Sequence, residues 1–314
     1  MSVASPYAEQ LARTPTATRV LTLAGSDTHV WEYGRAGTDA ASRADARILL
    51  VVVHGFRGDH HGLEPVIAQL GSTGTVPGLR IVAPDLPGFG VSTPLTATHD
   101  IDGYAAWLRA FVDTVRAESP AARVVLLGHS FGSILVSAAL ATGPGVAADA
   151  AVLVNPISAP ALTGPRGVMT RLAIGYYRFS AAVPEKLGFA ILRSPLVVRV
   201  ISITMAKTHD KGLRRWIHDQ HDRYFSAFAN RAVVLDAFRA SVSHDVSEYA
   251  ERIAVPTLMI AADNDDITPI EAQHAVQQTI PDARLVILDD VGHLIHYERP
   301  VEAAAAVTEF LTRG

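Results

Sequence analysis

A serine between two glycines is the part of this 314-residue chain best suited to chemistry. The apolar run Val124–Leu127 leads into Gly128-His129-Ser130-Phe131-Gly132, and residues 133–141 then have helical character. Glycines on both sides of Ser130 permit a tight turn from strand to helix, with the hydroxyl exposed at the helix N-terminus. Because amide groups and the helix dipole favour negative charge there, Ser130 is predicted to be a nucleophile. The alternative is an ordinary strand-to-helix turn.

A serine nucleophile needs a base to take its proton and an acid to orient that base. His293 directly follows Gly292 after the last apolar strand pattern, and its imidazole is the candidate base. The alternative is a surface-loop histidine, one of 13 in the chain. The candidate acids follow the preceding strand pattern, where a carboxylate would accept the His293 Nδ1–H. The residues alone leave three of them open, with the others as helix-capping or turn residues: Asp263, Asp265 and Asp266.

The negative oxygen that forms on the substrate needs two backbone N–H donors. Residues 54–58, His-Gly-Phe-Arg-Gly, follow the apolar run 48–53, and their glycines permit a turn that would aim the Phe56 amide at this oxygen. The Phe131 amide, directly after the serine, is the second predicted donor. An ordinary glycine-rich turn is the alternative. Three neighbouring residues are predicted to contact the substrate: His54, Gly55 and His129.

The elements that must position these groups alternate between strand and helix along the chain. Short apolar runs predict strands at 19–25, 28–35, 48–53, 79–83, 123–127, 150–154, 257–261 and 284–288. Helical spacing or composition predicts helices at 63–71, 101–117, 133–141, 270–279 and 300–312. This alternation predicts an α/β fold with a mainly parallel sheet.

The segment 156–250 interrupts this alternation. Its strand signals fade, prolines punctuate its first part, and amphipathic helical patterns such as 213–228 follow. We therefore expect an α/β core formed by residues 1–155 and 251–314, and a helical cap inserted at 156–250. The alternative is a plain second layer of helices.

Four motifs follow one another along the chain. They are His54-Gly55-Phe56, the turn Asp85-Leu-Pro-Gly-Phe-Gly-Val-Ser92, Gly128–Gly132, and Gly292-His293 followed by Glu298-Arg299-Pro300. With these motifs in this order, nearly the whole chain resembles the α/β-hydrolase superfamily. A partial fifth motif, Gly-x-x-Asp-x-x-x-Pro, aligns with 262–269 and selects Asp265 as the acid, although Ala262 replaces the glycine. The resemblance implies an eight-stranded, mostly parallel sheet flanked by helices, with a cap inserted after the sixth strand.

The resemblance implies a serine hydrolase that cleaves an ester-type bond of a small hydrophobic substrate through an acyl-enzyme, without a cofactor. Ser130, Asp265 and His293 would be its triad. Carbon–carbon bond hydrolysis and cofactor-free haloperoxidase or perhydrolase chemistry use the same triad and stay open. A non-catalytic ligand-binding protein of the same fold is the alternative from another class. Family members with an aspartate nucleophile, such as epoxide hydrolases, are disfavoured by Ser130.

Composition argues against several other classes. The net charge of −4 and the lack of a basic run give nucleic acid no electrostatic footprint. The absence of cysteine excludes a thiolate nucleophile and Cys-ligated metals. His60 and His61 stand beside Asp59, but adjacent histidines are expected to point apart, so no metal site is predicted.

No membrane span is predicted, because Arg193, Pro195 and Arg199 interrupt the most apolar stretch, 187–205. The N-terminal residues lack a signal-peptide pattern, and a cytoplasmic protein is expected. The expected partner is a small-molecule substrate, and the sequence predicts no particular oligomeric state.

Overall fold

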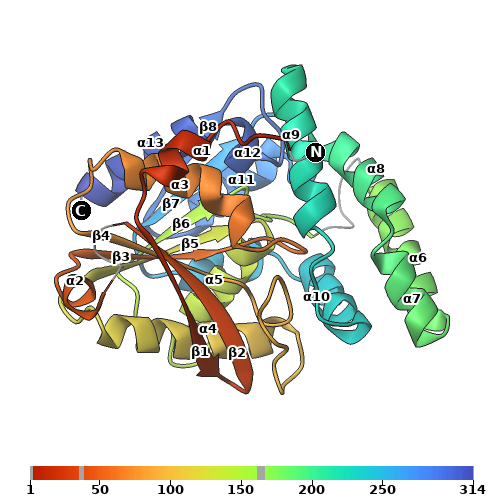
Figure 1. The fold of residues 1–314 in the computed structure, drawn as a ribbon, viewed down its shortest axis with the longest axis horizontal. Coiled ribbons are helices and arrows are strands. Elements are labelled where there is room, and N and C mark those ends of the chain that lie inside the picture. The colour runs from red at the N-terminus through yellow and green to blue at the C-terminus, as the bar shows by residue number, and fades with distance from the viewer. Residues whose placement is uncertain (1–2, 35–38, 161–166, 314) are drawn as a thin grey trace.

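A computed structural model of the chain describes residues 3–34, 39–160 and 167–313. One eight-stranded sheet has the strand order β1-β2-β4-β3-β5-β6-β7-β8 (Figure 1). The strands are β1 (Thr16–Leu23), β2 (Ser26–Tyr33), β3 (Ile48–Val53), β4 (Leu79–Pro84), β5 (Arg123–His129), β6 (Ala150–Val154), β7 (Thr257–Ala262) and β8 (Ala283–Leu288).

The six strands β3 to β8 are parallel to one another, whereas β2 is antiparallel to both β1 and β4. From β3, the chain continues to β4 on one side, and β5 lies on the other side. This reversal of strand order creates a crevice beyond the carboxyl ends of β3 and β5, which is where α/β sheets bind ligands.

Both faces of the central strands are buried, which explains their continuous apolar runs in the sequence. Along β3, Leu49, Val51 and Val53 pack into the core on one face, whereas Leu50 and Val52 pack on the other. Helices α4 (Ile101–Ala117) and α5 (Phe131–Ala141) contribute to the first core, and α3 (Glu64–Ser72) and α13 (Pro300–Arg313) to the second. The remaining helices of the core are α1 (Ala8–Ala12), α2 (Ala40–Ala44), α11 (Ile270–Thr279) and α12 (Ile295–Glu298).

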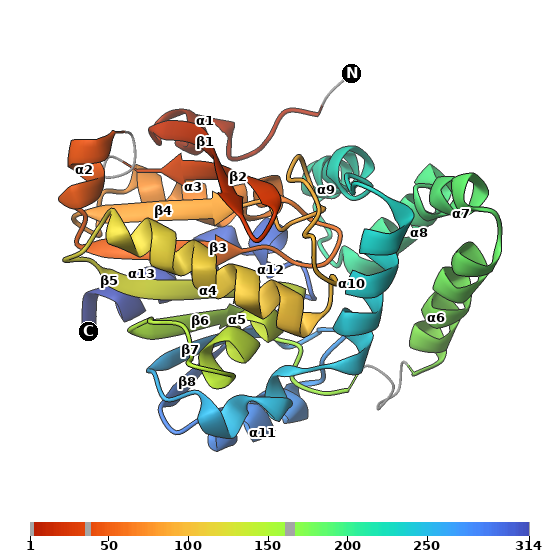
Figure 2. The same cartoon turned by 90° about the horizontal axis from the view of Figure 1, so that it is seen from below.

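Between β6 and β7 the chain forms helices that we call the helical insertion. They are α6 (Gly167–Ala182), α7 (Glu185–Leu192), α8 (Pro195–Met205), α9 (Lys211–Tyr224) and α10 (Arg231–Ser243). Figure 2 shows these helices gathered beyond one end of the central strands. The insertion falls within the range predicted for a cap, of which residues 161–166 lie outside the described residues.

The predicted strands and helices coincide with observed elements to within a few residues. The first two strands form a hairpin that turns at Ala24-Gly25, and β2 starts at Ser26, two residues before the predicted strand, because Ser26 already pairs with Leu23. Its second strand ends at Tyr33, and residue 35 of the predicted strand lies outside the described residues.

Candidate active site

Ser130 stands at a strained turn between β5 and α5. Its backbone has φ 53° and ψ −118°, a left-handed conformation that costs free energy in any residue except glycine. Gly132 makes the turn possible, because a Cβ there would lie 2.3 Å from the Val53 carbonyl oxygen of the neighbouring strand. The predicted sharp turn is therefore present, and it holds the serine at the crevice between β3 and β5.

The hydroxyl of Ser130 is the end of a chain of hydrogen bonds. Its Oγ lies 2.7 Å from Nε2 of His293, and Nδ1 of His293 lies 2.8 Å from Oδ2 of Asp265. Because a carboxylate only accepts, Nδ1 carries the imidazole proton and Nε2 accepts from the serine. The geometry matches what a serine nucleophile, its base and an orienting acid require.

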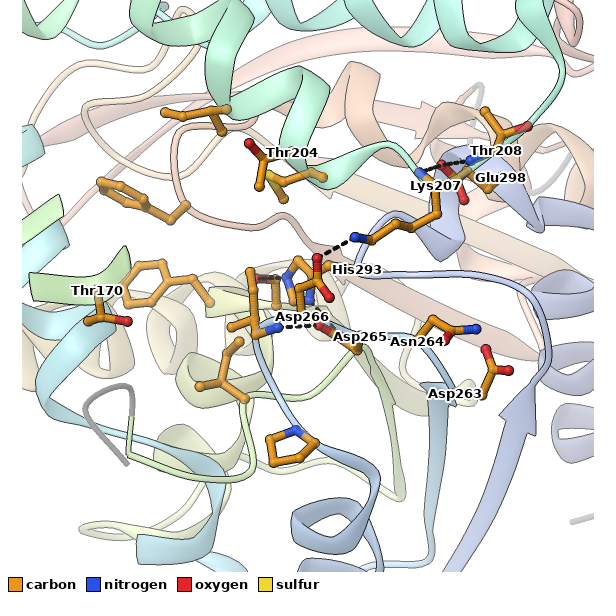
Figure 3. A pocket seen from close by; sticks show the side chains of 18 of the residues that line it. Thr170, Thr204, Lys207, Thr208, Asp263, Asn264, Asp265, Asp266, His293 and Glu298 are labelled. Carbon is orange, nitrogen blue, oxygen red and sulfur yellow. Dashed lines mark hydrogen bonds and ion pairs between the residues drawn. The ribbon is translucent and has the colours of Figure 1, made fainter. Parts of the chain in front are cut away.

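The structure separates the three candidate acids (Figure 3). Asp265 is buried and hydrogen-bonds His293. Asp263 instead accepts a hydrogen bond from the Val291 amide at 3.3 Å, and Asp266 forms an ion pair with Lys207. Burial alone would raise the pKa of Asp265, but the adjacent His293 and the hydrogen bonds that the carboxylate accepts outweigh it, so the pKa is lowered. Asp265 thus remains an anion beside the imidazole.

Asn155, at the end of β6, was missed by sequence reasoning. It is fully buried, and its Nδ2 donates to Oδ2 of Asp265 at 3.0 Å and to the Gly292 carbonyl at 3.3 Å. Its backbone φ of 44° is again left-handed. The amide therefore orients the carboxylate and the loop that carries His293. An asparagine directly after a buried strand and before Pro156 was the available signal.

The loop after β3 lies against the serine, as predicted. A Cβ on Gly55 would lie 3.2 Å from Cβ of Ser130, so a side chain there would crowd the serine. Phe131 opens α5, where helix geometry leaves its amide without an acceptor inside the helix. Both residues predicted as amide donors, Phe56 and Phe131, line the same cavity as Ser130.

His54, predicted to contact substrate, has both of its ring nitrogens occupied by backbone groups. Its Nδ1 lies 2.8 Å from the Gly55 carbonyl oxygen, and its Nε2 accepts from the Leu86 amide at 2.8 Å. With both ring nitrogens engaged by backbone, His54 fixes the loop to the turn after β4 and offers the substrate no free nitrogen. Burial lowers the pKa of His54, so the ring is neutral in this position.

Arg57 connects this loop to the helical insertion. Its guanidinium is buried and donates to the Phe225 carbonyl at 2.9 Å, to the Leu192 carbonyl at 2.7 Å and to the Tyr177 hydroxyl at 3.1 Å. These three acceptors come from α6, the end of α7 and the residue after α9. A single side chain next to Phe56 thus reaches three parts of the insertion.

A cavity of about 1280 Å³ opens above Ser130, between the sheet and the insertion (Figure 3). One part of the cavity wall is apolar, and both the core and the helical insertion contribute to it. It includes Phe56, Phe131, Ile157, Ala173, Ile201, Met205 and Val242. Another part carries charged and polar groups, among them Lys207, Asp266, Glu298 and Arg299. The cavity can therefore hold a molecule with an apolar part and a polar end.

A second cavity of about 60 Å³ shares Ser130 and His293 with the first. It is lined by His129 and His296, whose Nε2 and Nδ1, respectively, are buried and have no hydrogen-bond partner among the described residues. Burial and the charge of His293 lower the pKa of His129 to about 3. This space is large enough for a few water molecules or one small polar group. The three residues predicted to contact substrate line only this smaller space: His54, Gly55 and His129.

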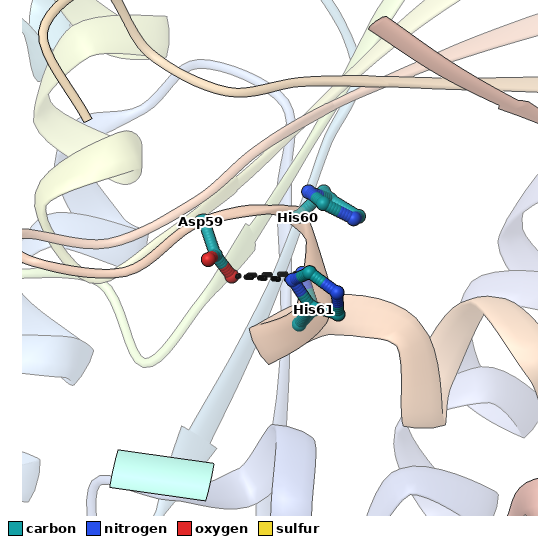
Figure 4. Close-up of side chains that lie close together, drawn as sticks. All are labelled: Asp59, His60 and His61. Atoms are coloured by element: carbon teal, nitrogen blue, oxygen red, sulfur yellow. Dashed lines mark hydrogen bonds and ion pairs between the residues drawn. The ribbon is translucent and has the colours of Figure 1, made fainter. Parts of the chain in front are cut away.

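Asp59, His60 and His61 form the one group in the described part of the chain with clustered metal-binding atoms, all within 4.8 Å of one another (Figure 4). The expectation that the two rings point apart is wrong, since their centroids lie 3.8 Å apart. The rings stack in a column between Trp31 and Tyr224. Each Nδ1 faces a carboxylate, that of Asp85 for His60 and that of Asp59 for His61. That the chain binds no metal stays a prediction.

Comparison with known proteins places this geometry in a family. A family model described as the alpha/beta hydrolase family matches residues 50–307. The chain belongs to this family. Lipase 1 of Psychrobacter immobilis is 25% identical to this alpha/beta hydrolase over 293 residues, which cover 90% of this chain and 80% of the lipase. Lipase 3 of a Moraxella species is 25% identical over 254 residues, which cover 78% of this chain and 71% of that lipase.

Solved structures share the fold of this alpha/beta hydrolase. An esterase from Exiguobacterium antarcticum has a TM-score of 0.70 at 17% identity, and covers 93% of this chain and 98% of its own. A bromoperoxidase from Bacillus anthracis has a TM-score of 0.69 at 16% identity, and the match covers 95% of this chain and 100% of the bromoperoxidase chain. The predicted family and fold class are confirmed.

Proposed function

We propose that this alpha/beta hydrolase cleaves an ester-type bond of a small molecule with a hydrophobic part. The observation that carries the proposal is the unbroken chain of hydrogen bonds from Asp265 through His293 to the strained Ser130. Its similarity to two lipases supports ester bonds over other bonds that this chemistry can break.

In the proposed reaction, His293 Nε2 takes the Ser130 proton as Oγ attacks the carbonyl carbon. The tetrahedral intermediate collapses when the same nitrogen returns the proton to the leaving alkoxide, which departs as an alcohol. Water then attacks the acyl-enzyme with His293 as base, and the acid and free Ser130 are released. Asp265 holds the tautomer throughout and stabilises the imidazolium.

The Phe56 and Phe131 amides are the proposed donors to the negative oxygen of the intermediate. Supporting this, Phe56 follows the glycine that packs against Ser130, and Phe131 begins α5, whose dipole favours negative charge. Such donors, held in place before reaction, contribute several kcal/mol to the stability of the transition state.

Two unequal cavities support a substrate with unequal parts. The cavity of about 1280 Å³ has an apolar wall suited to the larger hydrophobic part, whereas the neighbouring 60 Å³ accommodates only a small group. Since helices of the insertion supply part of the larger wall, we propose that the insertion is the cap that selects this part.

Labelling with a fluorophosphonate tests the proposal, because only an activated serine reacts with it. We expect the wild-type protein to be labelled and to hydrolyse p-nitrophenyl esters, and Ser130→Ala to lose both properties while keeping its fold. Ser137→Ala is a matched control on the same helix, since that buried hydroxyl has no hydrogen-bond partner among the described residues.

A series of acyl-chain lengths, together with a dienone substrate for carbon–carbon cleavage, separates the reactions that share this triad. Preference for the dienone would replace ester hydrolysis by carbon–carbon hydrolysis. A folded protein that binds ligands but is never labelled would instead be a non-catalytic member of the fold.

A further inference from the structure

The outward faces of α6, α7 and α8 carry a cluster of exposed large apolar side chains, which we call the apolar face. Its members are between 52% and 73% exposed: Leu172, Phe179, Leu187, Leu196, Val200 and Ile203. In addition, the stretch Glu185–Met205, which forms the two helices α7 and α8, is apolar, yet only 22% of its most apolar window is buried. Soluble proteins seldom gather such side chains in one region without a binding role.

Spacing places these side chains on one side of their helices. On α8, Leu196, Val200 and Ile203 recur at i, i+4 and i+7, and form a single stripe. The residues of α8 that line the cavity are different ones: Ile201, Thr204 and Met205. Substrate binding in the cavity therefore does not account for the exposed stripe.

Positive charge accompanies the apolar face. Between residues 167 and 205 the chain has five basic residues and one acidic residue, Glu185, although its overall net charge is −4. Arg199 is paired with Asp222, while four basic residues are exposed beside the apolar side chains: Arg171, Arg178, Lys186 and Arg193. Apolar groups flanked by Lys and Arg suit the headgroup region of an anionic lipid bilayer.

We propose that the apolar face binds the surface of anionic phospholipid membranes, with α6–α8 lying in the headgroup region. The inference rests on the proposed function only in that an ester-bearing lipid could then reach the cavity, to whose wall α6 and α8 contribute. A second copy of the chain fits less well, because a two-fold dimer through this face would bring its like charges together.

Sedimentation with vesicles tests the proposal on the full chain. We expect wild-type protein to bind vesicles of phosphatidylcholine with about a quarter phosphatidylglycerol, to release as sodium chloride is raised, and to bind pure phosphatidylcholine weakly. Leu196→Glu and Val200→Glu should each weaken binding by about tenfold or more. Val301→Glu, at a side chain of similar exposure on α13, should have no effect.

Replacing the cations gives a second measurement. Arg171→Gln with Arg178→Gln should weaken binding by more than about tenfold, since each basic residue near an anionic surface strengthens binding about fivefold. These side chains are exposed, so the variants should fold and keep wild-type hydrolysis of a soluble short-chain ester.

Several results would overturn the proposal. One is no binding to anionic vesicles, and another is binding that the Leu196→Glu substitution leaves unchanged. A third is a wild-type dimer that this substitution converts to a monomer, which would assign the face to a second copy. Ser130→Ala should bind vesicles as wild type does, so failure of the proposed catalysis is measured separately from failure of membrane binding.

Discussion

Asp265→Asn is expected to lower kcat/KM for ester hydrolysis about a thousandfold. In the transition state His293 carries a positive charge, and Oδ2 of Asp265 lies 2.8 Å from its Nδ1. For charge centres about 4 Å apart in an effective dielectric constant of about 20, the attraction is about 4 kcal/mol. Since about 1.4 kcal/mol corresponds to a factor of ten in rate, losing it slows the reaction by about three powers of ten.

The loop itself supplies the controls. Initial rates with a short-chain p-nitrophenyl ester should be measured for Asp265→Asn, Asp263→Asn and Asp266→Asn, with circular dichroism to verify folding. The last two variants should stay within about tenfold of wild type, because Asp263 accepts a hydrogen bond from the Val291 amide and the partly exposed Asp266 pairs with Lys207.

Two outcomes would refute this reasoning. One is an Asp265→Asn enzyme that keeps more than about a tenth of the wild-type kcat/KM. The other is a loss of about a thousandfold at either neighbouring aspartate instead, which would mean that the acid is assigned to the wrong position of the loop.

Gly132→Ala is expected to destabilise the protein by about 3 kcal/mol in urea denaturation, because the new Cβ would meet the Val53 carbonyl oxygen. The control Gly175→Ala, in open space on α6, should instead stabilise the protein by about 0.5–1 kcal/mol. Equal effects of the two substitutions would contradict this reasoning. Asn155→Ala should lower kcat about tenfold or more with little change in KM, since its hydrogen bond to the charged Asp265 contributes about 1.5–3 kcal/mol. Steady-state kinetics measures this effect, and an unchanged kcat would exclude a positioning role for Asn155. The free energy of unfolding should fall from about pH 7 to about pH 5, because His129, with a pKa of about 3, stays neutral when folded but binds a proton below about pH 6.5 when unfolded. Denaturation of His129→Asn should show a shallower fall, and an identical pH dependence would show that other groups cause it.

The central strands were the most predictable part of the fold. Ile48–Val53 lies between two helical layers, so every position must be apolar and the run is visible without any structural information. The start of α5 was less visible, because its first turn contains Phe131 and Gly132 and has no helical periodicity. The arrangement of the insertion was not predictable, since amphipathic patterns specify which face is buried but not against which partner.

The candidate site shows the same division. The turn at Ser130 could be predicted because its geometry depends on residues adjacent in sequence. The choice among the three aspartates depends on a contact with His293, 28 residues away from Asp265, and only the resemblance to a family favoured the observed one. The stacking of His60 on His61 depends on Trp31 and Tyr224, which come from distant elements, so local backbone preference gave the wrong expectation.

Arg57 has a consequence for how such enzymes can be re-engineered. Its buried guanidinium is held by acceptors from three parts of the insertion, so a foreign set of cap helices would leave the charge without partners. Residue 57 is also the immediate neighbour of Phe56, so the resulting strain would be passed to the backbone beside Ser130. A chimera that exchanges α6–α10 as a module must therefore exchange the loop 54–58 with it. The structural unit that contains the insertion therefore extends across its boundary with the core.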